Sequence, residues 1–356
     1  MRSTTVLFVV LITLTCTNLS FGQLIFNFDF ASGTPINVQN GVIEAADLWR
    51  AKLKDPVTIN VNVDYANTNP VLAETAPTPG NESYSIFKDR LLSDATSVAD
   101  MSAYNSLQSG TTFDTLMNYT SDNPNGDGSP TPYVATRDMV QVTTANAKAL
   151  GILPGDWMVV PDASISFNPN PDGSVWDFDR SNGIASGQYD FVGAAAHELG
   201  HVLGFYSQVD AIDQEGFLKS LLPDLFDVRT ADEYTAVSLD MFRYSAASLA
   251  QGAGIEDMTA GMGEKFFSID GGVTSLANFS SGTFLGDGRQ AGHWQGSSFG
   301  LMGPQAVPGV QLPDISFADL TAMDVIGWDL VAVPEPNMVS ILFLGLLGVA
   351  TNRRRR

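Results

Sequence analysis

Two histidines and a glutamate stand close together in the segment His197-Glu198-Leu199-Gly200-His201. On an α-helix, residues four positions apart lie on one face, so His197 and His201 would point the same way. Two imidazole nitrogens in that arrangement can bind one zinc ion at about 2.1 Å. Glu198 would lie beside the ion and accept a proton from a water that the ion activates. The segment therefore predicts a helix with two metal ligands and a general base. The alternative is a helix with two surface histidines.

A glycine follows this pattern at the position where the helix is expected to end. Gly204 comes three residues after His201, where glycine can end a helix in a left-handed turn. The pattern His-Glu-x-x-His-x-x-Gly resembles the metzincin clan of zinc proteases. The common metzincin pattern has its third ligand at the position of Ser207. Serine is a poor zinc ligand, so either the third ligand lies elsewhere or the chain is not a metzincin.

A later segment offers that third ligand. His293 precedes Trp294, and Leu301-Met302 follows shortly afterwards. The leishmanolysin-like branch of the metzincins interrupts the motif with a long insertion before a His-Trp pair and a Leu-Met turn. The chain resembles this arrangement, with residues 210–291 as the insertion, and it also resembles a group of exported bacterial proteases that end in PEP-CTERM sorting signals. The resemblance implies zinc on His197, His201 and His293, with Glu198 as general base and a methionine turn at Met302.

The resemblance also implies a fold. We expect an α+β metzincin-like zincin whose upper lobe, about 23–204, holds a twisted mixed sheet and the active-site helix. The lower lobe, about 205–333, would be mostly irregular or helical and would carry the methionine turn. Residues 319–328 resemble the closing helix of such a fold. Substrate would lie in the cleft between the lobes.

The number of histidines supports the same site independently. A catalytic zinc ion takes three protein ligands and leaves one position open, and the chain contains three histidines in all. A loop histidine bonded to backbone is the alternative for His293. Acidic residues downstream of His201 are rival ligands, and the nearest, Asp210, could instead orient a histidine. The rivals are Asp210, Asp213, Glu215, Asp224 and Glu233.

The patterns of apolar residues outline the elements around the site. Helical spacing predicts helices over 41–53, 89–107 and 136–150, and another that begins after Asp190 and carries the histidines. Alternation predicts strands at 57–63, 163–168 and 175–178. Residues 66–82 and 120–133 are rich in loop-forming residues. This order of helices and strands is typical of an α+β protein.

The two ends of the chain have the composition of export signals. Arg2, an apolar run from Val6 to Leu14 and Ser20-Phe21-Gly22 indicate a signal peptide over 1–22. At the other end, Val333-Pro334-Glu335-Pro336, a short apolar run and four arginines resemble the PEP-CTERM sorting signal. The signal, 334–356, implies transient membrane anchoring and cleavage by an exosortase-type enzyme, with a plain tail anchor as the alternative. We expect a catalytic domain over 23–333, exported to the cell envelope or beyond in a Gram-negative bacterium.

The composition of the chain limits the classes of partner that it can bind. Lys and Arg number 18 against 39 Asp and Glu, which gives a formal charge of −21. Such a chain would repel phosphate backbones, so nucleic-acid binding is excluded as a default and a monomer is expected. Asp122, Asn125 and Asp127 could hold calcium, but their spacing does not match an EF-hand loop, so a surface turn is favoured.

These observations predict metal-assisted hydrolysis of a protein or peptide substrate. Tyr206, Tyr234 and Tyr244 could assist the reaction, although each fits a packing role better. One alternative is a non-catalytic matrix or adhesion protein that keeps the fold with a structural zinc. The presence of Glu198 argues against it, because a structural site needs no base. A hydrolase of another amide or ester would use the same site.

Overall fold

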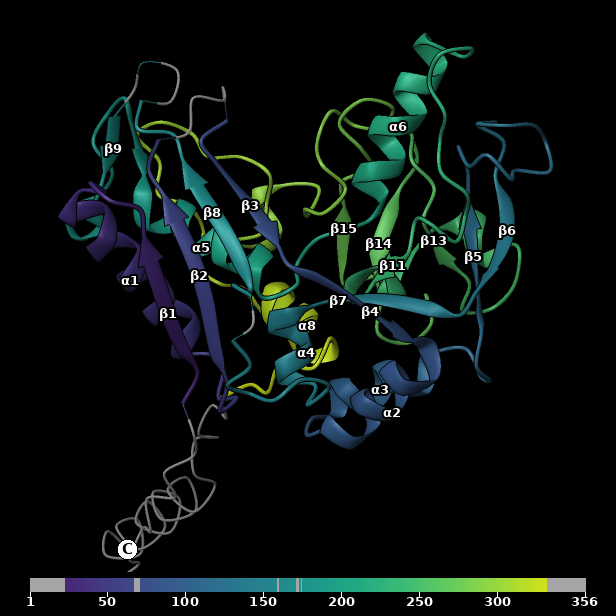
Figure 1. Cartoon of the computed structure of the whole chain (residues 1–356), viewed down its shortest axis with the longest axis horizontal. Helices are drawn as coiled ribbons and strands as arrows, with labels where there is room; N and C mark the ends of the chain where they lie inside the picture. The colour runs from purple at the N-terminus through teal and green to yellow at the C-terminus, as the bar shows by residue number, and fades with distance from the viewer. Residues whose placement is uncertain (1–22, 67–70, 159, 171–172, 174, 332–356) are drawn as a thin grey trace, which may run out of the picture.

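The computed structural model describes residues 23–66, 71–158, 160–170, 173 and 175–331 (Figure 1). The predicted signal peptide and the predicted sorting segment lie outside these residues. Helices and strands are mixed along the described chain, and both parallel and antiparallel strand pairs occur. The predicted α+β class is therefore confirmed.

A four-stranded mixed sheet supports the helix that carries the histidines. Its order is β1 (Ile25–Phe30), β2 (Thr58–Asp64), β8 (Ala163–Phe167) and β3 (Ala73–Pro77). The first three strands are parallel, whereas β3 runs antiparallel to β8 along the edge of the sheet. In β2, Ile59, Val61 and Val63 are buried and alternate with more exposed polar residues. This alternation gives the sheet one apolar face to cover.

Two helices pack against each other behind this sheet in Figure 1. They are α1 (Ile36–Arg50) and α5 (Phe191–Val202). The Trp49 indole N–H donates to the Ala196 carbonyl over 2.8 Å. A Cβ at Gly41 would come within 2.5 Å of the Phe191 ring, so glycine allows the two helices to approach closely. These buried contacts fix α5 against α1.

The rest of the described chain forms short elements around this unit. One sheet joins β4 (Pro79–Ser83), β7 (Met139–Thr143) and β11 (Ala236–Val237), and a second joins β5 (Phe113–Met117), β6 (Tyr133–Arg137) and β13 (Glu256–Asp257). A third joins β12 (Arg243–Tyr244), β14 (Lys265–Phe267) and β15 (Ala277–Phe279), and β9 (Val175–Asp177) pairs with β10 (Gln188–Asp190). The remaining α-helices are α2 (Tyr84–Asp94), α3 (Val98–Ser106), α4 (Thr144–Ala149), α6 (Val209–Leu221), α7 (Ala246–Leu249) and α8 (Phe317–Val325).

Several predicted elements agree with the structure. The strands expected at 57–63, 163–168 and 175–178 are β2, β8 and β9, and the helix expected after Asp190 is α5. The helix expected at 41–53 is α1, which begins earlier, at Ile36. The helix that resembles the closing helix is α8.

Three predicted segments were wrong. Residues 66–82 were expected as loop but contain β3 and the start of β4, which are stabilised by pairing with β8 and β7. The helix expected over 136–150 is confined to α4, because Val140 and Val142 bury one face of strand β7. The helix expected over 89–107 is two helices, since Ser97 and Asp100 form a capping box that starts α3 anew. By contrast, residues 205–331 are mostly irregular or helical, as expected, and also contain the short strands β11 to β15.

Within the described ranges, no helix is long and apolar enough to cross a bilayer. The apolar run predicted to anchor the chain belongs to the sorting segment outside these ranges.

Candidate metal centre

The helix that carries the predicted ligands begins and ends where the sequence suggested. The Asp190 carboxylate caps α5 by accepting a hydrogen bond of 2.9 Å from the Gly193 N–H. Asp190 is buried and lies 3.2 Å from the Arg180 guanidinium, which balances its charge. After the helix, Gly204 adopts φ +116°, so the predicted glycine turn is present. The turn leads the chain back beneath the helix.

The three histidines meet at one point. The Nε2 atoms of His197 and His201 are 3.1 Å apart. The Nε2 atom of His293 lies 3.0 Å from that of His197 and 3.2 Å from that of His201. His293 is buried, and the other two side chains are half-buried. The structure therefore brings together all three predicted ligands, including the one from far along the sequence.

Backbone carbonyls orient two of these rings. The Nδ1 atom of His197 lies 2.9 Å from the Leu301 carbonyl, and that of His201 contacts the Phe205 carbonyl. A carbonyl can only accept, so the Nδ1 atom of each of these rings donates, and Nε2 is the atom that can present a lone pair to a metal. Burial lowers the pKa of His201 to about 3 and, with repulsion from His201 and His197, that of His293 well below its usual value. The rings of His201 and His293 therefore remain neutral, and metal binding requires neutral imidazoles.

This donor set fits a zinc ion. The centre of three atoms about 3.1 Å apart lies about 1.8 Å from each, so an ion about 1 Å out of their plane would reach the usual zinc–nitrogen distance of about 2.1 Å to all three. Bare imidazole nitrogens this close repel one another, and a cation between them would remove the repulsion. The group can hold a metal ion. Three histidines are a ligand set of catalytic zinc sites.

Glu198 lies beside this group and is held by a residue of the sheet edge. The Thr75 hydroxyl, on β3, donates to Glu198 Oε2 over 2.6 Å. Burial raises the pKa of Glu198, while His197 and the Thr75 hydrogen bond lower it. Thr75 had no predicted role, because it belongs to the segment 66–82, which was expected to be a loop. No local motif would have identified it.

The Leu301-Met302 turn packs directly under α5. Met302 is fully buried, and a Cβ at Gly200 would come within 2.3 Å of its sulfur. The buried Asp319 carboxylate on α8 accepts hydrogen bonds from the backbone N–H groups of Leu301 and Met302. It also accepts one from the Trp294 indole. The closing helix thus holds both the turn and the residue next to His293.

In the described part of the chain, the side chains considered as alternative metal ligands lie apart from the histidine group. Asp210 accepts from the N–H groups of Ala291 and Gly292, and Asp213 accepts from those of Phe284 and Leu285. Glu215 pairs with Arg229, Glu233 binds Thr230, and Asp224 is exposed. The Ser207 hydroxyl donates to Asp240. None of these side chains joins the histidine group.

The other side chains considered from sequence also have structural partners. The hydroxyls of Tyr206, Tyr234 and Tyr244 donate to Gln141, Glu215 and the Met241 carbonyl respectively. In the loop considered for calcium, Asp122 accepts from Ala231 and Tyr133, whereas Asp127 pairs with Lys219. These acidic groups have different partners, which favours the surface turn.

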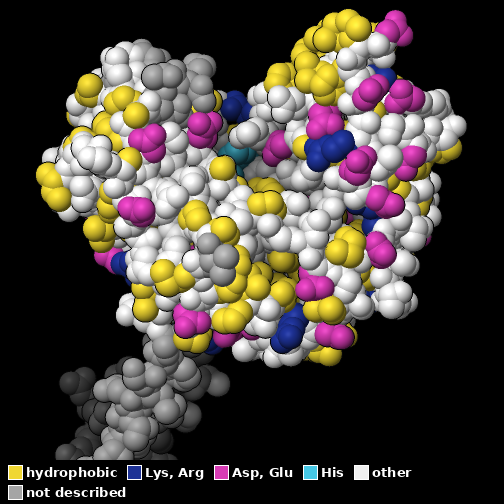
Figure 2. Space-filling model, in the orientation of Figure 1, with side chains coloured by type: hydrophobic (Ala, Val, Ile, Leu, Met, Phe, Trp, Pro, Cys, Tyr) yellow, Lys and Arg dark blue, Asp and Glu magenta, His cyan; other side chains and the backbone are white. Residues whose placement is uncertain are grey.

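The histidines are accessible from one side. Figure 2 shows histidine atoms on the floor of a hollow between the part that carries β3 and the part that carries α6. The chain has no histidines other than these three, so the hollow leads to the candidate centre. A substrate could approach the three Nε2 atoms through it.

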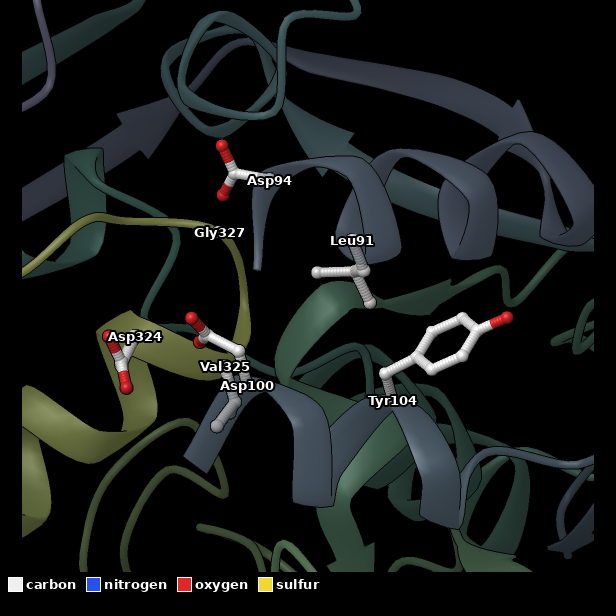
Figure 3. Close-up of a pocket in the computed structure, with 7 residues that line it drawn as sticks. All are labelled: Leu91, Asp94, Asp100, Tyr104, Asp324, Val325 and Gly327. Carbon is white, nitrogen blue, oxygen red and sulfur yellow. The ribbon is translucent and has the colours of Figure 1, made fainter. Parts of the chain in front are cut away.

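A separate cluster of carboxylates lies where α2, α3 and α8 meet. Figure 3 shows Asp94, Asp100 and Asp324 around a small cavity that Tyr104 also lines. Burial, together with repulsion from neighbouring aspartates, raises the pKa of Asp94 to about 7 and that of Asp324 to about 7. The same causes raise the pKa of nearby Asp55 to about 8. This cluster is not part of the histidine group.

Comparisons with known proteins do not place the chain in a family. No family model matches it, and no curated protein or solved structure is significantly similar. The function of the chain therefore has to be inferred from the geometry of the site.

Proposed function

We propose that this chain is an exported, zinc-dependent endopeptidase of the metzincin type, with the leishmanolysin-like spacing of its ligands. The observation that carries the proposal is the meeting of three histidine Nε2 atoms within 3.2 Å of one another, with Glu198 beside them. The Leu301-Met302 turn under α5 supports the same class. A purely structural metal site would not need a buried carboxylate next to its ligands.

Each residue of the site has a role in this proposal. A zinc ion held by His197, His201 and His293 would supply Lewis-acid polarisation of water and of the peptide carbonyl. Glu198 takes a proton from the attacking water and then passes it to the leaving amine. Burial raises the pKa of this carboxyl, which favours the return of the proton. Thr75 holds Oε2 and so orients the carboxylate.

The edge of the sheet is suited to an extended peptide. Strand β3 pairs with β8 on one side, and in the part of the chain that the structure describes no strand pairs with its other side. A peptide can add to such an edge through backbone hydrogen bonds. Because Thr75 lies on β3 and contacts Glu198, a peptide at this edge would pass close to the general base. This arrangement favours a peptide over a small ester as substrate.

The test combines metal analysis with a single substitution. The purified protein is expected to contain about one zinc ion and to cleave unstructured proteins such as casein, with loss of activity in chelator. Glu198→Ala should retain zinc but lose at least about a hundredfold in activity, because it removes the acid–base group. Glu44→Gln, an exposed glutamate on α1, is the matched control and should behave as wild type.

Three results would contradict the proposal. A protein without bound zinc would remove its basis. Unchanged peptidase activity in Glu198→Ala would mean that Glu198 is not the base. Zinc binding without any peptidase activity would favour the non-catalytic alternative, a matrix or adhesion protein with a structural ion.

A further inference from the structure

The position of His293 has to be set by contacts far from α5 in sequence. The residues between His201 and His293 include α6, η3 (Ser238–Phe242) and five short strands. Yet the Nε2 atom of His293 lies as close to each of the other two as those two lie to each other, within 3.0–3.2 Å. Some contact must therefore hold the backbone just before His293 against the region that follows α5.

Asp210 makes that contact. It lies in the first turn of α6, soon after the chain leaves the glycine turn. One carboxylate oxygen accepts a hydrogen bond from the Ala291 N–H, and the other accepts from the Gly292 N–H over 3.0 Å. These are the two residues directly before His293. Two hydrogen bonds from adjacent backbone N–H groups to one carboxyl group hold the main chain at both residues.

Two further contacts fix the same backbone. A Cβ at Gly292 would come within 3.0 Å of the Asp210 carboxylate and 3.1 Å of the Ser207 nitrogen, so glycine permits the close approach. The buried Arg243 guanidinium donates to the Ala291 carbonyl over 3.1 Å and to the Ser280 carbonyl over 2.7 Å. Ala291 is thus held at its N–H by Asp210 and at its carbonyl by Arg243. These contacts leave little conformational freedom to the two residues directly before His293.

We propose that Asp210 is a positioning residue for the metal centre: it places His293 in bonding range of the ion by holding the backbone of Ala291 and Gly292. The inference rests on the proposed metal site and deepens it. Asp210 does not ligate the metal and does not contact an imidazole ring. It acts through the main chain, so its loss should weaken metal binding without removing a ligand.

The same helix supplies a matched control. Asp213, one turn further along α6, is buried and accepts hydrogen bonds of 2.8 Å from the N–H groups of Phe284 and Leu285. It makes the same kind of contact as Asp210, but with a part of the chain several residues before His293. General loss of stability would affect both variants, whereas loss of ligand position would affect only Asp210.

The experiment compares Asp210→Asn with Asp213→Asn in the otherwise intact chain. An amide cannot accept two N–H groups with two oxygens, so each substitution breaks one hydrogen bond and sets an NH₂ group against an N–H. Zinc affinity is measured by competition with a chromophoric chelator, and thermal unfolding is measured for the metal-free proteins. Asp210→Asn should bind zinc about 10- to 100-fold more weakly, the usual effect of removing an outer contact of a metal site. Asp213→Asn should bind zinc with nearly wild-type affinity.

A second variant protects the test against misfolding. Gly292→Ala introduces a methyl group into the same contact and should also weaken zinc binding. The absorption spectrum of the cobalt-substituted protein should change in Asp210→Asn and Gly292→Ala but not in Asp213→Asn, because it reports ligand geometry. Wild-type zinc affinity in both Asp210→Asn and Gly292→Ala would overturn the role proposed for Asp210. An equal loss of zinc affinity in Asp213→Asn would do the same. Neither result would contradict the proposed function. A wild-type protein that binds no zinc would overturn the proposed function as well.

Discussion

The hydrogen bond between Thr75 and Glu198 allows a quantitative test of how the sheet edge serves the site. The Thr75→Val substitution removes the hydroxyl but keeps the shape and the strand preference of the side chain. The lost bond is short, 2.6 Å, and its acceptor is a carboxylate. Bonds to charged groups contribute about 1.5–3 kcal/mol. If this energy orients the carboxylate for proton transfer, kcat should fall by about 10- to 150-fold.

The assay separates this effect from loss of structure. Initial rates on a quenched-fluorescent peptide give kcat and KM, and zinc content is measured on the same samples. Thr75→Val should lower kcat with little change in KM or zinc content, because Thr75 contacts Glu198, the proposed base, and not the three histidines. Thr75→Ser retains a hydroxyl and should recover most of the rate. Wild-type kcat in Thr75→Val would show that the Thr75 hydroxyl does not orient Glu198, and so would a Thr75→Ser variant as slow as the valine variant.

The remaining predictions concern metal, packing and pH. Removal of zinc by a chelator should lower the Tm by several degrees, since an ion at 100 times its Kd stabilises the folded state by about 2.7 kcal/mol; an unchanged Tm in scanning calorimetry would exclude tight binding. Gly200→Ala should destabilise the protein by about 1–3 kcal/mol in urea unfolding, because its Cβ would meet the Met302 sulfur at 2.3 Å. The pKa values of about 7 for Asp94 and Asp324 lie above that of an aspartate in the unfolded chain. Between about pH 4 and 8 the folded state therefore binds more protons than the unfolded state. The free energy of unfolding should fall as the pH rises through this range. Asp94→Asn should therefore stabilise the protein at pH 8 and have little effect at pH 4, as measured by urea unfolding at both values; a larger gain at pH 4 would contradict the sign.

The histidine helix was predictable because its signal is local. The spacing of His197 and His201 requires only the period of an α-helix to place both rings on one face. Gly204 was predicted to turn the chain, and its φ of +116° follows from the freedom that glycine has there. His293 followed from the small number of histidines and the ligand count of catalytic zinc.

The strand β3 was not predictable in the same way. Its residues, Ala73–Pro77, show no clear alternation of apolar and polar side chains, and its stabilising hydrogen bonds come from β8, far along the chain. Edge strands bury little on either face, so their sequences carry a weak pattern. With β3 assigned to a loop, the contact between Thr75 and Glu198 could not be foreseen.

The amino-acid sequence alone indicates which side chains could bind a metal or move a proton, and it places two of the candidate ligands on one helical face. The folded chain was needed to show how His293 reaches the other two histidines and what holds Glu198. Asp210 was recognisable as an acidic residue near the motif, but its partners are the backbone N–H groups of Ala291 and Gly292. Backbone groups are the same in every residue, so contacts to them leave no mark in the sequence and become visible only when the chain is folded.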